Sequence, residues 1–118
     1  MSVNKMIIVG NLGADPDFKN TQNGTPMVKM SVATNRYSKN RDGEREKETQ
    51  WHRVVVFGKQ AERCNSYLSK GDQVFVEGYV ETRKWTDDEG VERRIFSLVA
   101  RNVEFLSYSG GGNSRRAA

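Results

Sequence analysis

The sequence predicts one small all-β domain, a five-stranded Greek-key barrel with a single short helix between the third and fourth strands. Three observations support this prediction. The chain has 118 residues, which is enough for one modest core and too few for a second domain. Most apolar residues recur with the two-residue period of strands, in runs separated by turn residues. Only one segment, which follows Gly58, has the spacing of a helix.

The first half of the chain supplies three of the strands. Residues 3–11 form a compact apolar run that ends at glycines, and loop and turn are then expected up to Asn23-Gly24, a typical hairpin turn. Residues 27–35 alternate between two faces and predict the second strand. Residues 36–48 mix charges of both signs, which is compatible with a long exposed loop and equally with a protruding hairpin tip. Residues 50–58, rich in β-branched and aromatic side chains, predict the third strand.

The period changes after the third strand. Ala61, Cys64 and Leu68 are spaced as on one face of a helix. Gly71 follows them and predicts where this helix stops. The helix is therefore expected to be only a few turns long.

The last two strands are residues 73–85 and residues 93–106, which are joined by a polar turn. Gly78 indicates a bend or bulge of the kind that barrel corners need, and the last strand is expected to change face near Arg101. This order of elements is the one expected of an OB-fold, a small barrel whose outer face and loops bind oligonucleotides or oligosaccharides. Because a fold does not fix a function, the site residues decide it.

The composition restricts the function classes. Lys+Arg 19 against Asp+Glu 15 gives a net charge of +4, a mild preference for polyanions. Cys64 is the single cysteine, so no intrachain disulfide forms and a reduced compartment is expected. The chain shows neither a secretory signal nor an apolar run of ~20 residues, so we expect a cytoplasmic protein without membrane association.

No cofactor, metal or catalytic residue is expected. His52 is the only histidine, and the one cysteine lies far from it in the sequence, so metal ligation is not predicted. The acidic residues of the turns are ordinarily solvated, and no nucleophile lies beside them. The chain is therefore expected not to be an enzyme.

The third strand carries the first candidate binding residues. Trp51, Arg53 and Phe57 share one face, and the opposite face is apolar enough to be core. Flat rings beside a guanidinium form a platform for unpaired bases, each stack being worth roughly 1–3 kcal/mol. The alternative is that both rings are half-buried core residues and the arginine is a solvated surface charge.

The fourth strand repeats this combination. Arg83 and Trp85 share a face, and Lys84 lies beside them at the root of the hairpin. Two sets of aromatic and basic side chains on barrel strands of a mildly basic protein favour a nucleic-acid interface.

Four segments resemble, in order and spacing, the bacterial single-stranded DNA-binding protein (SSB) family. They are VGNLG at residues 9–13, WHRVVVFGK at 51–59, YLSKGDQV at 67–74 and TRKW at 82–85. The resemblance extends from Val3 to about Tyr108. It implies an OB-fold protein, usually a homotetramer although a dimer is also open, that binds single-stranded DNA in replication, recombination and repair.

The resemblance also implies roles for individual residues. Four aromatic side chains match or lie near base-stacking positions: Trp51, Phe57, Trp85 and Tyr37. Seven basic side chains are expected along the sugar-phosphate path: Lys5, Arg53, Lys59, Lys70, Arg83, Lys84 and Arg93. Three side chains are expected at interfaces between subunits: His52, Gln73 and Phe75.

The chain departs from the family pattern at its end. The folded domain is expected to span residues 1–108, and residues 109–118 to form a disordered tail rich in glycine and serine. Family members usually continue to an acidic tip that recruits replication and repair enzymes, and this sequence gives no support for that recruitment. The missing acidic tip is compatible with a truncated chain and equally with a short paralogue. The rival function is a barrel of the primosome-accessory type, which docks proteins and binds nucleic acid weakly.

Overall fold

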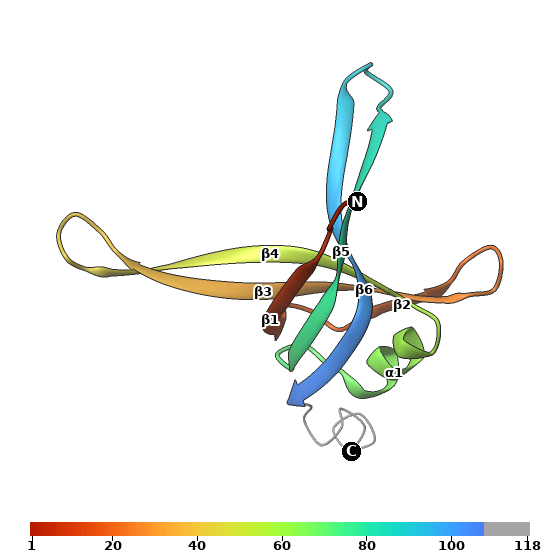
Figure 1. Cartoon of the computed structure of the whole chain (residues 1–118), viewed down its shortest axis with the longest axis horizontal. Coiled ribbons are helices and arrows are strands. Elements are labelled where there is room, and N and C mark those ends of the chain that lie inside the picture. Colours follow the sequence, from red (N-terminus) through yellow and green to blue (C-terminus); the bar gives the residue numbers. More distant parts are fainter. Residues whose placement is uncertain (108–118) are drawn as a thin grey trace.

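The computed structural model describes residues 1–107 and confirms the predicted all-β architecture (Figure 1). The described elements follow in the order β1 (Met6–Leu12), β2 (Asp17–Asn20), β3 (Pro26–Lys39), β4 (Arg45–Phe57), α1 (Lys59–Tyr67), β5 (Gln73–Thr86) and β6 (Glu92–Ser107). The tail predicted at residues 109–118 lies outside the described residues.

The strands close into the predicted barrel. They follow the order β1-β5-β6-β4-β3-β2, and β1 also pairs with β3, so that five strands form a ring and β2 lies outside it. The closing contact joins Asn11 to Ala33 and Leu12 to Val32. The pair of β4 and β6 is parallel, and the others are antiparallel. This five-stranded ring, with the helix between its third and fourth strands, is the OB-fold.

The strand β2 was not predicted, because this segment was expected to be loop and turn. It pairs with β3, with Phe18 opposite Val28. Phe18 is its only apolar residue and packs against the core, so no alternation was visible in four residues. The turn at Asn23-Gly24 is confirmed, since Gly24 has a φ of 82° and joins β2 to β3.

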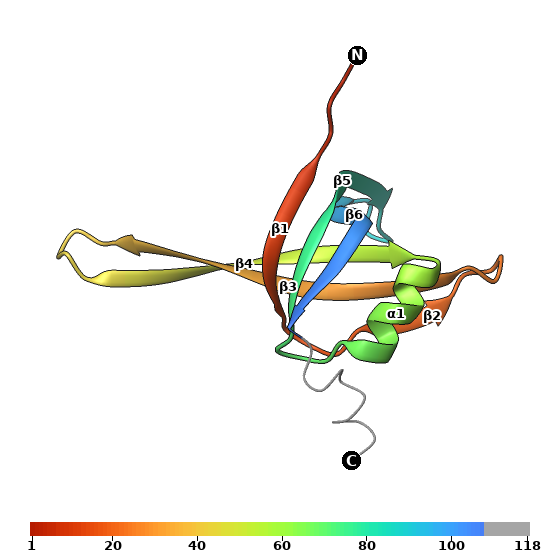
Figure 2. The ribbon, with the colours of Figure 1, turned by 60° about the horizontal axis from the view of Figure 1, so that its bottom comes forward.

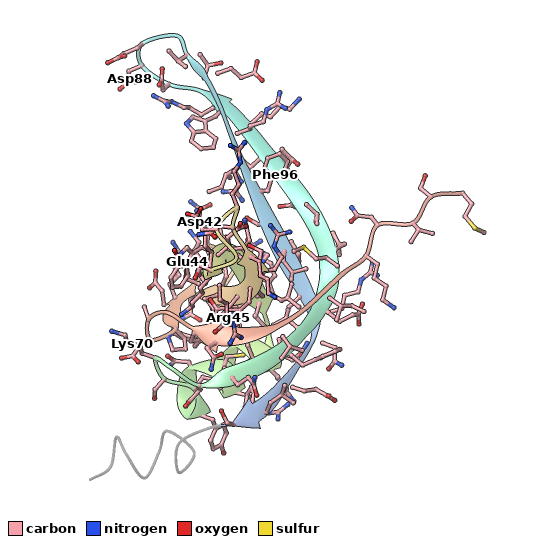
Figure 3. The ribbon with its side chains drawn as sticks, turned by 90° about the vertical axis from the view of Figure 1, so that its left-hand side faces the viewer. Asp42, Glu44, Arg45, Lys70, Asp88 and Phe96 are labelled. Carbon is pink, nitrogen blue, oxygen red and sulfur yellow. The ribbon has the colours of Figure 1, made fainter. Side chains whose placement is uncertain are left out.

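Residues 36–48 form a hairpin rather than a loop. The strands β3 and β4 pair up to Lys39 and Arg45, and this hairpin, hereafter the arm, projects from the barrel (Figure 1). Polar cross-strand contacts hold it, among them an ion pair of 2.7 Å between Arg36 and Glu48. The hairpin of β5 and β6 projects in a different direction, as the positions of Asp42 and Asp88 at the two tips show in Figure 3.

The helix α1 lies beside β2 and β3 at one end of the barrel (Figure 2). Ala61 and Cys64 are its buried residues, as predicted. The prediction that Gly71 ends the helix is wrong. The last helical residue is Tyr67, and Gly71, with a φ of 94°, belongs to the turn that follows, where its N–H donates to the carbonyl of Leu12.

Valines at every second position of the strands fill the core. Val54 and Val56 on β4, and Val74 and Val76 on β5, are fully buried, which confirms the inward faces expected from the two-residue period. The bulge expected near Gly78 is also present. Gly78 pairs with Ala100 and Glu77 with Asn102, so Arg101 is an extra residue in β6.

Candidate nucleic-acid interface

The outer face of β4 carries bare aromatic rings. Trp51 is 60% exposed and Phe57 is 44% exposed, whereas their neighbours Val54 and Val56 are fully buried. Arg53 lies between the two rings on the same face and is also exposed. The alternative that the two rings are half-buried core residues is therefore wrong.

The β5–β6 hairpin provides the second group. Trp85 is 46% exposed, and Arg83, two residues earlier, shares its face. Arg93 of β6 is opposite Trp85 in the register and forms an ion pair of 2.9 Å with Asp87. Lys84 has the opposite parity, so it belongs to the other face of the hairpin.

A groove of about 370 Å³ joins these two groups. It contains four of the predicted binding residues, Arg53, Phe57, Arg83 and Trp85. Its other lining residues come from β2, β3, β4, β5 and β6: Lys19, Met27, Lys29, Val55, Tyr79, Glu81, Ile95, Ser97 and Val99. Strands far apart in the sequence thus bring a phenyl ring, an indole and several cations into one open channel, hereafter the main groove.

Trp51 lies outside the main groove, on the far side of Arg53. It lines two neighbouring hollows, one of about 360 Å³ shared with Lys29 and Asp15, and one of about 120 Å³ shared with Phe96. Arg53 lines both hollows as well as the main groove. The side of β4 therefore offers a continuous series of depressions, from Trp51 past Arg53 to Phe57.

Other predicted residues do not line the main groove. Tyr37 lies on the arm, where the guanidinium of Arg45 stands 4.1 Å from the centre of its ring and covers one ring face. Lys5, Lys59 and Lys70 are exposed, at the N-terminal segment, the start of α1 and the turn after α1. A single-stranded nucleic acid that contacted all three lysines would have to run around the barrel.

The predicted interface residues lie apart from the main groove. His52 is half-buried, with its Nε2 2.8 Å from the hydroxyl of Thr34. Gln73 and Phe75 are half-buried on β5, and Phe75 is opposite the exposed Val9 of β1 in the register.

The structure adds residues that sequence reasoning missed. Lys19 was missed because it belongs to β2, which was not predicted. Lys29 was missed because its place beside the main groove depends on the pairing of β3 with β4. Phe96 of the last strand is 59% exposed. It was missed because the inner and outer faces of this strand could not be separated along its whole length. Strand pairing, which no local pattern reveals, is the missing information in all three cases.

Among residues 1–107, no group of three or more His, Cys, Asp or Glu side chains is arranged to hold a metal ion. In the same part of the chain, no helix has the length and apolar character needed to cross a membrane.

The model of the single-strand binding protein family matches residues 3–106. Relatives include single-stranded DNA-binding protein 1 of Xylella fastidiosa, 48% identical over 89% of this chain and 78% of its own length. The single-stranded DNA-binding protein of Xanthomonas axonopodis is 46% identical over 93% of this chain, which spans only 61% of that relative's length.

Solved structures agree with these relatives. The structure described as the SSB of Plasmodium falciparum in complex with ssDNA superimposes with a TM-score of 0.82, at 31% identity, over 91% of this chain and 97% of that chain. A deletion mutant of the single-stranded DNA binding protein from Thermus aquaticus gives a TM-score of 0.77, at 30% identity, over 89% of this chain and 51% of that chain. The chain described above therefore belongs to the single-strand binding protein family.

Proposed function

We propose that this protein binds single-stranded DNA without sequence preference and without catalysis, and protects it during replication, recombination and repair. The observation that carries the proposal is the main groove, where exposed rings alternate with cations. Membership of the family and the names of the relatives support it. The same role implies a location in the cytoplasm, with the DNA.

The proposed mechanism has two parts. Bases stack on Trp51, Phe57 and Trp85, and each stack is worth roughly 1–3 kcal/mol because every base has a π face. Arg53 and Arg83, which lie between the rings, neutralise the phosphates and release counterions. Duplex DNA is expected to bind poorly, since its bases are already paired and stacked.

The remaining predicted residues extend this path. We infer that Tyr37 on the arm offers its uncovered ring face to a base. The cations outside the main groove, Lys5, Lys59, Lys70, Lys84 and Arg93, are proposed to guide the backbone around the barrel. Arg93 is the weakest of these candidates, because Asp87 already neutralises it.

We further propose that copies of the chain assemble, with a homotetramer as the expected state. Val9 is exposed on β1 and lies opposite Phe75 in the register, so the two form an apolar strip on the outside of the sheet. Apolar surface of this kind is stabilised when a partner covers it. Gln73, next to this strip, and His52 are the other proposed interface residues.

Tryptophan emission tests the binding proposal directly. The chain has two tryptophans, and both lie on the proposed site. Adding oligo(dT) at low salt is expected to quench the emission strongly, and a matched hairpin duplex is expected to leave it nearly unchanged. Unchanged emission with oligo(dT), together with an unaltered electrophoretic mobility, would remove the proposal.

Sedimentation distinguishes the rival function. An oligo(dT) of about 35 nucleotides exceeds the ~4–16 nucleotides that one OB-fold covers. A DNA-wrapping tetramer is expected to bind it tightly and change its sedimentation coefficient. A dimer with weak affinity for the oligonucleotide would instead favour a barrel whose main task is to dock proteins.

A further inference from the structure

Three cations from adjacent strands meet on one wall of the main groove. Lys19 of β2, Lys29 of β3 and Arg53 of β4 all line it. Lys29 and Arg53 also line the larger Trp51 hollow. Lys29 and Arg53 therefore stand between the depression that holds Trp51 and the one that holds Phe57 and Trp85, and Lys19 joins them on the main-groove side. These three side chains are hereafter the cationic ridge.

The acids beside the cationic ridge are Asp17, which is opposite Lys29 in the register, and Asp15, which lines the Trp51 hollow together with Asp17. Within residues 1–107 the ion pairs are Arg36 with Glu48, Arg93 with Asp87 and Arg94 with Glu92, so no ridge residue takes part in one. The ammonium of Lys19 is the first cause that lowers the pKa of Lys29, followed by partial burial and, more weakly, by Arg53. Asp17 is the acid that acts in the opposite direction, and it is the smallest influence.

Repulsion between neighbouring cations is unfavourable for folding. Like charges at this spacing destabilise a sheet unless an anion lies between them. Glu81 is the acid among the lining residues of the main groove, and it belongs to the opposite wall formed by β5, which also carries Arg83. The lining residues of β2, β3 and β4 include three cations and no acid, so an anion in the groove is attracted more strongly to this wall than to the β5 wall, where Glu81 offsets Arg83.

We propose that Lys19, Lys29 and Arg53 form an anion site that holds a backbone phosphate of single-stranded DNA, at the point where the strand passes from the Trp51 hollow into the main groove. This inference rests on the proposed function and deepens it. The ridge fixes where the backbone crosses between two stacking surfaces. The rings on either side then receive the bases that flank this phosphate.

Salt dependence provides the test. An oligo(dT) of ~16 nucleotides, about the most that one OB-fold covers, is titrated at several salt concentrations with wild type, Lys29→Gln and the double variant Lys19→Gln/Lys29→Gln. Losing one phosphate contact is expected to lower the log–log slope by about 0.7 and the affinity about two- to fivefold. Arg63→Gln is the charge-matched control, because Arg63 stands against Phe105 and lines a different hollow.

A pH series gives a readout that a merely structural role would not move. Because the pKa of Lys29 lies below its usual 10.5, wild type is expected to lose affinity relative to Lys29→Gln as the pH rises, before an ordinary lysine would lose its charge. Comparison at equal pH cancels ionisation of the bases. The charged groups that face Lys29 are Lys19 and Asp17 from β2, Arg53 from β4, Asp15 across the Trp51 hollow, and Glu81 and Arg83 on the β5 wall.

The outcomes separate the two proposals. If wild type binds tightly and the double variant has the same log–log salt slope as wild type, the phosphate site is overturned and the proposed function stands. The same conclusion holds if Arg63→Gln lowers the slope and the affinity as much as the double variant does. Absence of binding by wild type overturns both. Inorganic phosphate is added as a competitor in a final arm. If inorganic phosphate competes with oligo(dT) for wild type but not for the double variant, the result supports an anion site at the ridge. If phosphate competes equally well for both proteins, the result counts against it.

Discussion

The indole of Trp51 lies directly against the backbone of Gly13. A Cβ atom at Gly13 would clash with Cζ3 of the indole and would come within 2.7 Å of its Cη2. Gly13 is not among the glycines with positive φ, so its backbone would accept alanine and only the space is lacking. One edge of the ring is thereby fixed, although Trp51 is 60% exposed.

The first prediction concerns this contact. Gly13→Ala is expected to displace the indole and to weaken oligo(dT) binding by about 1 kcal/mol, a fraction of one base stack. A double-mutant cycle with Trp51→Ala checks it by fluorescence anisotropy of labelled oligo(dT). If alanine at Gly13 costs as much affinity without the indole as with it, the contact has no part in binding.

The second prediction ranks aromatic against basic side chains. Trp51→Ala and Trp85→Ala are each expected to lose roughly 1–3 kcal/mol of binding free energy. Lys59→Ala is expected to lose about 0.2–1 kcal/mol, since an exposed charge is well solvated. Tyr67→Ala, on the outside of α1, serves as the aromatic control, and equal losses in all four variants would argue against stacking.

The third prediction concerns the arm. Tyr37→Trp is expected to strengthen binding several-fold, because an indole offers a larger π surface and Arg45 stacks on it better than on a phenol. Isothermal titration with oligo(dT) measures the change. The same substitution in an Arg45→Ala background shows whether the guanidinium contributes, and weaker binding by Tyr37→Trp would contradict a base at this ring.

The fourth prediction concerns the tip of the β5–β6 hairpin. The N–H of Val91 and then Arg93 hold the pKa of Asp87 below its ordinary 3.8. Since the folded pKa is the lower one, this stabilisation is present above the unfolded value and is lost as the pH falls through the folded value. The amides of Glu89 and Val91, which donate to Asp87, are expected to become less protected against exchange in that acidic range, relative to the unprotected rate at the same pH. Asp87→Asn, which does not titrate, is expected to abolish the pH dependence.

The fifth prediction uses the single cysteine. Burial raises the pKa of the Cys64 thiol to about 12, so the reactive thiolate is scarce at neutral pH. Alkylating reagents are expected to modify Cys64 only as fast as the protein unfolds. Mass spectrometry across a urea series measures this rate, and rapid modification of the native protein would show that the helix is not packed on the barrel as described.

Much of the fold could be predicted because the barrel strands alternate strictly. Val54 and Val56 follow a period that no helix would share, and they are fully buried. The opposite face of the same strand carries Trp51, Arg53 and Phe57, and the sequence alone left open whether the two rings are exposed or half-buried. The hairpin nature of the arm could not be decided, because polar pairs such as Arg36 with Glu48 replace the apolar alternation there.

The cationic ridge could not be predicted for a different reason. Lys19 lies on a strand of four residues with a single apolar side chain. No local pattern singles out Lys29, and only the register shows Val55 beside it and Arg53 two pairs further on. Local patterns give the face of a side chain, whereas its cross-strand neighbours depend on pairing between distant segments.

The extra residue Arg101 in β6 has a consequence for how this chain can change in length. Leu98 on one side of it and Val103 on the other are both buried, although an odd number of positions separates them. Removal of Arg101 alone would leave Gly78 opposite Ala100 and Glu77 opposite Asn102 in a regular register, so Leu98 and Val103 would stay on the core face and only the bulge would be lost. The chain can therefore lose one residue at this point without exchanging core and solvent side chains, whereas a one-residue deletion in a regularly paired stretch of β6 would have to be matched by a second change nearby.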